Sequence, residues 1–178
     1  ATVGKLKGIR YSMKGGSGTA SVTLDSGLTV GALVVVNAVG DILDPSTGEI
    51  LAGTLSDDRK TLADARILIR ENNMLVPDSS GTNTTIAIVA TNAKLSKSQV
   101  TKVAQMAQDG IARAIYPSHT TRDGDTVFSL ATGTFQVNSD VSIIGSLAAD
   151  MIVESILRAL NSAESLKGIP SVNDLNDR

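Results

Sequence analysis

The residues of greatest chemical interest form a short polar cluster, Thr82-Asn83-Thr84-Thr85, at the point where a loop meets an apolar strand. A threonine hydroxyl is a poor nucleophile until a base removes its proton. If the bond before Thr84 were cut, the new α-amine could be that base, because an α-amine has an ordinary pKa of about 7.7–8.0. Clusters of Thr and Asn are more often simple turns. The case for Thr84 as a nucleophile therefore depends on other residues.

Most other kinds of catalytic site are excluded by residue types that the chain lacks. It has no cysteine and one histidine, His119, so disulfides, thiolate catalysis, cysteine-ligated zinc and histidine-rich metal sites are excluded within it. There is no Gly-x-Ser-x-Gly elbow, and a lone histidine is more often structural than part of a Ser-His-Asp set. The glycine-rich stretch 14–18 lacks the ending of a phosphate-binding loop and predicts a flexible turn. We expect neither a cofactor nor a metal.

Composition indicates a soluble globular protein with an aliphatic core. Apolar residues make up 42% of the 178 residues, yet only two Phe, two Tyr and no Trp are among them. The chain has sixteen basic and eighteen acidic residues, and they form no block of like charge. This balance argues against nucleic acid or an anionic membrane as a partner. The chain shows no apolar run of membrane-spanning length and no signal-peptide core at its start. A cytoplasmic location is therefore expected.

The elements that would position these residues change character along the chain. Residues 1–82 are rich in Gly and Val and predict strands and turns, including a β-branched run at 28–36 that is typical of a buried strand. A polar stretch at 77–83 then predicts an exposed loop. After it, two strands alternate with two helices. Their expected bounds are 86–90 and 126–130 for the strands, and about 96–115 and 140–160 for the helices.

Apolar stripes and flanking residues predict the two helices. In the first helix, apolar residues recur at three- and four-residue steps, Ser96 or Ser98 can cap its start, and Pro117 stops it. The tail after Gly168 is polar and is predicted to be loose. Strands that alternate with helices in this way predict an α/β or α+β sandwich, in which the helices cover a sheet.

The stretch from Gly81 to Asn92, which contains the polar cluster, resembles the processing site of the L-aminopeptidase/D-esterase family. That family includes β-peptidyl aminopeptidases, nylon-oligomer hydrolases and a pantetheine-trimming hydrolase of antibiotic biosynthesis. The Asn-Thr junction is similar to the one that is cut in the nylon-hydrolase and pantetheine-hydrolase branches. The resemblance therefore implies self-cleavage between Asn83 and Thr84, with Thr84 as the new N-terminal nucleophile.

Further segments in the same order along the chain resemble the family and imply roles for four residues. The segment 119–128 is similar to one in which nylon hydrolases carry two acids flanking a glycine, and these fall here on Asp123 and Asp125. By themselves they predict a solvated turn, although residues two apart would face the same side of a strand. An upstream segment resembles the one whose asparagine helps to bind the oxyanion, and this residue is Asn37 here. Lys5 falls where nylon hydrolases have an active-site lysine; by type alone it would be an exposed surface charge.

The resemblance implies a four-layer αββα sandwich of the self-processing N-terminal nucleophile type, which belongs to the α/β (α+β) class. Family members carry roughly as much sequence again upstream, including a tyrosine that lines the active site, so the sandwich is expected to be incomplete at its N-terminal side. Residues 1–83 would end the α-chain and residues 84–178 would form the β-chain, together in one domain. The missing N-terminal segment of the same enzyme is an expected partner. Family members commonly form tetramers, so we also expect a homo-oligomer.

The implied activity is hydrolysis of peptide or amide bonds through an acyl-enzyme on Thr84. Its hydroxyl would attack the Asn83 carbonyl before processing and a substrate amide afterwards. The Asn37 amide would bind the oxyanion, while Asp123 and Asp125 would lie near the ammonium or hydroxyl. An aminopeptidase acting on small peptides or amides is the first expectation. A hydrolase of nylon-type oligomers, an acyltransferase of the ornithine acetyltransferase type and an inactive interaction module stay open as alternatives.

Overall fold

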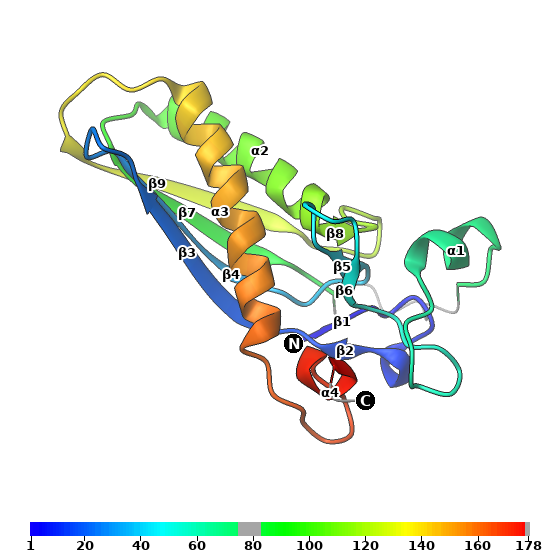
Figure 1. Ribbon diagram of the computed structural model, residues 1–178. Coiled ribbons are helices and arrows are strands. Elements are labelled where there is room, and N and C mark those ends of the chain that lie inside the picture. Colours follow the sequence, from blue (N-terminus) through cyan, green and yellow to red (C-terminus); the bar gives the residue numbers. More distant parts are fainter. Residues whose placement is uncertain (75–82, 177–178) are drawn as a thin grey trace.

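A twisted four-stranded sheet with two long helices on one face forms the body of the chain (Figure 1). The computed structural model describes residues 1–74 and 83–176. The strand order is β3-β4-β7-β9, in which β4 runs antiparallel to β3 and β7, whereas β7 and β9 are parallel. The strands are β3 (Ser17–Thr23), β4 (Thr29–Val35), β7 (Ile86–Ala93) and β9 (Thr126–Phe135).

The helices α2 (Lys97–Ala114) and α3 (Val141–Asn161) confirm the two predicted from the sequence, and each begins after a capping residue. The hydroxyl of Ser96 accepts a hydrogen bond from the backbone N–H of Gln99, whose side chain accepts one from the N–H of Ser96 in return. Asp140 caps α3 with its carboxylate. Both predicted strands after the loop are present as well, and both run further than predicted.

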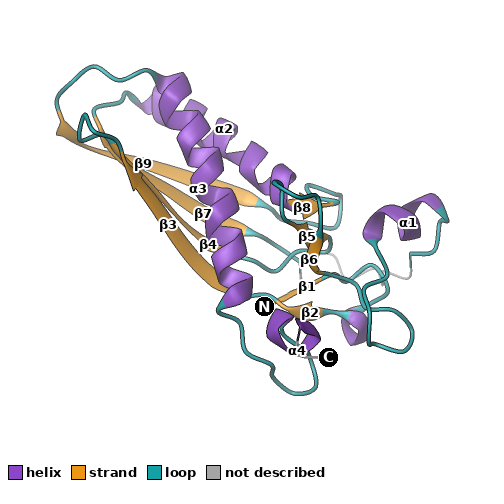
Figure 2. Cartoon of the chain, in the orientation of Figure 1, coloured by secondary structure: helices purple, strands orange, loops and turns teal. Residues whose placement is uncertain are grey.

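Small residues let α2 and α3 pack side by side on the sheet, as Figure 2 shows. A Cβ added at Gly110 of α2 would lie 2.4 Å from the carbonyl oxygen of Ala149 in α3. The core beneath the two helices is aliphatic, as the composition predicted. Among the described residues, neither of these helices nor any other is both long and apolar enough to cross a membrane.

The other face of the sheet is open among the described residues. Successive residues of a strand point to opposite faces, so Val34 and Val89 are buried beneath the helices while Leu33 and Ile88 are exposed. A strand is present within 28–36 as predicted, but only the residues that face the helices are buried, because the helices cover one face of the sheet. The apolar side chains on the open face are Leu33, Val35, Ile86, Ile88, Phe128 and Leu130.

Two smaller sheets and two short helices lie beyond one end of the main sheet (Figure 2). One sheet pairs β1 (Thr2–Val3) with β2 (Met13–Lys14), and the other has the order β6-β5-β8. The remaining strands are β5 (Asp41–Leu43), β6 (Ile50–Ala52) and β8 (Ile115–Tyr116), and the short helices are η1 (Ile9–Tyr11) and α1 (Ala65–Arg70).

The polar tail after Gly168 forms a short helix, α4 (Val172–Asn176), although the sequence predicted a loose segment. The N–H of Ser171 donates to the carboxylate of Asp174 at 2.7 Å, and Val172 is buried. The tail is also tied to β2, because the N–H of Lys14 donates to the carbonyl of residue 170 at 2.8 Å. The exposed loop predicted at 77–83 lies, Asn83 excepted, outside the described residues.

The main sheet draws two strands from each side of Thr84. β3 and β4 belong to residues 1–83, and β7 and β9 belong to residues 84–178. Because β4 pairs with β7 from Val30 to Val35, the two segments share one core. The division of the chain into two segments at Thr84 stays a prediction.

Candidate active site

The junction between Asn83 and Thr84 lies between two loops, and the strand order places it there. β7 is flanked by β4 and β9, so its start lies beside the residues that follow β4 and those that precede β9. The N–H of Thr84 donates to the carbonyl oxygen of Asn37 at 3.0 Å, and the N–H of Gly124 donates to the carbonyl oxygen of Asn83 at 2.9 Å. Asn83 and Asp123 also form a parallel β-bridge. Three segments far apart in the sequence therefore meet at one place.

The hydroxyl of Thr84 contacts the carbonyl group that precedes it. Thr84 Oγ donates to the oxygen of Asn83 at 2.6 Å, and the same oxygen accepts the N–H of Gly124. A Cβ built on Gly124 would lie 2.8 Å from Thr84 Oγ, so a side chain at this position would press on the hydroxyl. The carbonyl of the Asn83–Thr84 bond therefore has both a hydroxyl and a backbone donor against its oxygen.

Lys5 is buried at this junction with an exposed fraction of 6%. Its Nζ donates to the side-chain oxygen of Asn83 at 2.9 Å, and to the carbonyl and side-chain oxygens of Asn37 at 3.0 and 3.1 Å. Loss of water around Lys5 lowers its pKa to about 8, while the charge of Asp123 opposes this shift. The interpretation of Lys5 as an exposed surface charge is therefore wrong, because its ammonium group is enclosed by three oxygen acceptors.

The side chains of the two asparagines are held by fixed partners. Asn83 is 4% exposed, and its amide nitrogen donates to the carbonyl oxygen of Arg122 at 3.5 Å. Asn37 Oδ1 accepts the backbone N–H of Thr2 at 3.0 Å in addition to the ammonium of Lys5. The amide oxygen of Asn37 thus faces the N-terminal strand. The role of Asn37 as a donor to an oxyanion stays a prediction.

The two aspartates bind backbone groups around Thr84. Asp123 Oδ1 accepts the N–H of Val39 at 3.2 Å, and Asp125 Oδ1 accepts the N–H of Thr85 at 2.8 Å. The Thr84 hydroxyl donates to the preceding carbonyl, and the expected role of the two carboxylates near the ammonium or hydroxyl stays a prediction. The carboxylates do not share a strand face, since β9 begins only at residue 126. The Asp125 side chain is 2% exposed, so it is not part of a solvated turn.

Two groups that contact the residues of the junction were not predicted from the sequence. One is the N–H of Gly124, which carries no residue-type signal because every residue except proline has this group. The other is His119, which the sequence suggested to be structural. His119 Nδ1 lies 3.1 Å from Asp125 Oδ2, and the His119 backbone N–H donates to the same oxygen at 3.2 Å. A histidine six residues before an aspartate in a turn-rich segment was the only available signal for this contact.

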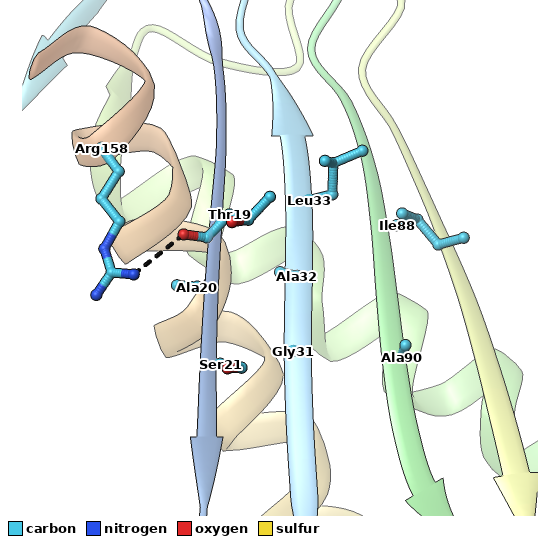
Figure 3. Close-up of a pocket in the computed structure, with 9 residues that line it drawn as sticks. All are labelled: Thr19, Ala20, Ser21, Gly31, Ala32, Leu33, Ile88, Ala90 and Arg158. Carbon is cyan, nitrogen blue, oxygen red and sulfur yellow. Dashed lines mark hydrogen bonds between the residues drawn. The ribbon is translucent and has the colours of Figure 1, made fainter. Parts of the chain in front are cut away.

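A hollow of about 330 Å³ on the open sheet face is separate from this junction (Figure 3). Small and aliphatic residues of β3, β4 and β7 line it together with Arg158 of α3. The guanidinium of Arg158 donates to the carbonyl oxygen of Thr19 at 3.2 Å. The lining residues do not include Thr84 or the residues to which it is hydrogen-bonded, so this hollow belongs to the uncovered face of the sheet and not to the candidate chemistry.

The sequence is similar to those of known peptidases and amide hydrolases. The model of peptidase family S58 matches residues 4–172. An uncharacterized aminopeptidase of Mycobacterium leprae is 42% identical, over 96% of this chain and 51% of its own length. A 6-aminohexanoate-oligomer endohydrolase of Kocuria sp. is 29% identical, over 72% of this chain and 39% of its own length. The chain thus spans about half the length of the M. leprae relative.

Two solved structures share the fold of this chain. A Burkholderia sp. beta-aminopeptidase matches 99% of this chain and 50% of its own, with a TM-score of 0.62 and 23% identity. The L-aminopeptidase D-Ala-esterase/amidase of Ochrobactrum anthropi, described as a variant of the Ntn hydrolase fold, matches 90% of this chain and 44% of its own, with a TM-score of 0.59 and 22% identity. The predicted fold class and the resemblance to the L-aminopeptidase/D-esterase family are thereby confirmed. Because the family model covers all but the ends of the sequence, the chain belongs to peptidase family S58.

Proposed function

We propose that the complete protein cuts its own Asn83–Thr84 bond and then hydrolyses amide bonds with Thr84 as the nucleophile. The observation that carries this proposal is the pair of contacts on the Asn83 carbonyl oxygen, 2.6 Å from Thr84 Oγ and 2.9 Å from the N–H of Gly124. For attack, the Thr84 hydroxyl must turn from the carbonyl oxygen of Asn83 to the carbon that is bonded to this oxygen. The Gly124 N–H is then a donor to the oxyanion that forms.

Self-cleavage proceeds in two balanced steps. Thr84 Oγ bonds to the Asn83 carbonyl carbon, the C–N bond breaks, and the hydroxyl proton passes to the nitrogen, which leaves an ester and a free amine. Water then adds to the ester, so that Asn83 ends in a carboxylate and Thr84 regains its hydroxyl. Removing one oxyanion donor costs about 2.7–4 kcal/mol of activation free energy in known hydrolases. We assign a contribution of this order to the Gly124 N–H.

The groups around the junction suit the second reaction, in which Thr84 attacks a substrate amide. The nitrogen that now donates to Asn37 O at 3.0 Å would become the α-amine, which would take the hydroxyl proton and return it to the leaving amine. Lys5, with its pKa lowered to about 8, would supply positive charge beside the oxyanion, together with the amide of Asn37. Asp125 would hold the backbone N–H of Thr85, next to the nucleophile, and Asp123 would hold that of Val39, two residues after Asn37.

The names of the relatives support an amide hydrolase, and that of the more similar one reported above supports an aminopeptidase. We propose small peptides or amides as its substrates. Hydrolysis of linear amide oligomers and acyl transfer to an amine are the alternatives. Release of free acid without an amine acceptor distinguishes hydrolysis from transfer. We propose that the remaining half of the protein covers the open sheet face, and that the complete protein is a homo-oligomer.

The experiment compares the full-length wild-type protein with Thr84→Ala and Thr84→Ser. Intact mass and N-terminal sequencing of the wild type should reveal a chain that starts Thr-Thr-Ile-Ala. Thr84→Ser should cleave at the same bond, since it keeps the hydroxyl, and Thr84→Ala should stay intact. Cleavage at this bond in Thr84→Ala would exclude Thr84 as the nucleophile. An uncut wild type without amidase activity would favour an inactive interaction module.

A further inference from the structure

The contacts of His119 connect an otherwise unassigned histidine to the residue that follows the candidate nucleophile. The backbone N–H of His119 donates to one oxygen of the Asp125 carboxylate at 3.2 Å, and the imidazole Nδ1 lies 3.1 Å from the same oxygen, within ion-pair distance. The other oxygen of that carboxylate accepts the N–H of Thr85 at 2.8 Å. The carbonyl of Thr85 in turn accepts the N–H of Thr126 at 3.0 Å. A chain of polar contacts therefore leads from the imidazole through Asp125 to the backbone beside Thr84.

The backbone of His119 is arranged to make this double contact. Its φ of 54° lies in the left-handed region, which residues other than glycine adopt in only a few per cent of cases, histidine, asparagine and aspartate more often than the rest. In this conformation the backbone N–H and the imidazole reach the same carboxylate oxygen. The imidazole is 37% exposed while the carboxylate is 2% exposed, so the histidine covers the buried acid from the solvent side.

We infer that His119 is a positioning residue for self-cleavage, a role that rests on the function proposed above. By fixing the carboxylate of Asp125, His119 keeps residues 124–126 paired with residues 83–85. This pairing holds the N–H of Gly124 on the carbonyl oxygen of the bond to be cut. When the imidazole is lost, the Asp125 carboxylate loses one of the three nitrogen atoms that contact it, and the Gly124 donor is no longer fixed. His119 itself touches neither the nucleophile nor the reacting carbonyl.

The test measures the first-order rate of self-cleavage, which needs no substrate binding because the scissile bond is part of the chain. His119→Gly tolerates the left-handed φ and keeps the backbone N–H but removes the imidazole. His119→Asn also tolerates this φ, and its amide nitrogen can occupy the position of Nδ1. We expect cleavage to slow roughly 10- to 100-fold in His119→Gly, as a small misplacement does in other enzymes. His119→Asn should recover most of that loss.

Two controls separate positioning from a general loss of structure. Lys167 has a φ of 53° on an exposed segment, so Lys167→Gly repeats the backbone change away from the junction and should leave the rate unchanged. Thermal unfolding of each His119 variant in the uncleavable Thr84→Ala background should match that of Thr84→Ala alone within a few degrees. A rate equal to the wild type in His119→Gly would overturn the proposal. Equal loss in the glycine and asparagine variants would overturn it too.

A spectroscopic measurement tests the contact itself. In ¹⁵N-histidine-labelled Thr84→Ala protein, the signal lost in His119→Asn identifies His119. The neutral imidazole should carry its proton on Nδ1, because Nδ1 is the ring nitrogen that lies 3.1 Å from the Asp125 carboxylate, and Asp125→Asn should abolish this preference. An Nε2-protonated form in Thr84→Ala would overturn the proposal even if the rates agreed with it. A wild type that never cuts at Thr84 would refute the proposed function and this role with it, whereas normal cleavage in His119→Gly would refute this role alone.

Discussion

Replacing Gly124 by alanine tests the geometry on which the proposed cleavage depends. The added Cβ would lie 2.8 Å from Thr84 Oγ, which is closer than a Cβ normally approaches another heavy atom. The Asn83 carbonyl oxygen, a backbone atom, would be 3.7 Å from it. The hydroxyl is the end of a side chain and can rotate away, so the fold can accept the methyl group. We therefore expect the free energy of unfolding to change by less than about 1 kcal/mol.

The same rotation moves the hydroxyl off the carbonyl that it must attack. A misplacement of this size costs roughly 100-fold in rate, or about 2.7 kcal/mol of activation free energy. The assay follows the first-order loss of uncut full-length protein by intact mass. Gly31→Ala is the control, because its added Cβ lies on β4 and meets no atom closer than 3.3 Å. Wild-type cleavage in a folded Gly124→Ala protein would show that the contact between the hydroxyl and the carbonyl does not lead to attack.

Three further predictions concern stability and association, the first two measured by urea unfolding of the uncleavable Thr84→Ala chain. Burial lowers the pKa of Lys5 from 10.5 to about 8, so between these pH values the unfolded chain binds a proton that the folded chain lacks, and stability should rise with pH. Lys5→Met should remove this rise. If the free energy of unfolding of Lys5→Met still rose with pH to the same extent, the rise would not be due to Lys5. Burial raises the pKa of Asp41 from 3.8 to about 6, so stability should fall as pH rises through this range, an effect that Asp41→Asn should abolish. The isolated 178-residue chain should self-associate through its open sheet face, and light scattering should show less association in Leu33→Glu and Phe128→Glu; a wild-type chain that stays monomeric would refute this.

The elements predicted well are those whose signals are local. α2 and α3 combine apolar stripes with capping residues at Ser96 and Asp140, and a helix with such signals forms wherever its stripe finds a surface. The tail is the opposite case. α4 spans only Val172–Asn176, too short for a periodic pattern, and its stability depends on the burial of Val172 against distant parts of the chain.

The residues of the candidate site also differ in whether they could be predicted from the sequence. Thr84, Asn37 and the two aspartates were predicted from a resemblance that matches residue types in order along the chain, and the fold brings the loops that carry them together. The same resemblance placed Lys5 at the site, but its residue type alone predicted a surface charge, because its burial depends on where β1 lies relative to the start of β7. The contact of the Gly124 N–H with the Asn83 carbonyl could not be predicted either, because it follows from the parallel register between β7 and β9.

The position of the proposed cut within the sheet affects how the mature protein comes apart. Two strands of one sheet precede Thr84 and two follow it, and β4 is hydrogen-bonded to β7 across that division. Once the bond is cut, unfolding becomes the separation of two polypeptides. The midpoint of unfolding of the cut protein should then rise with protein concentration. In uncut Thr84→Ala the two halves stay joined, so their separation should not make the midpoint depend on concentration. Refolding of the cut protein would require the two halves to meet again in solution, so processing would turn a reversible folding reaction into an assembly step that dilution makes slower.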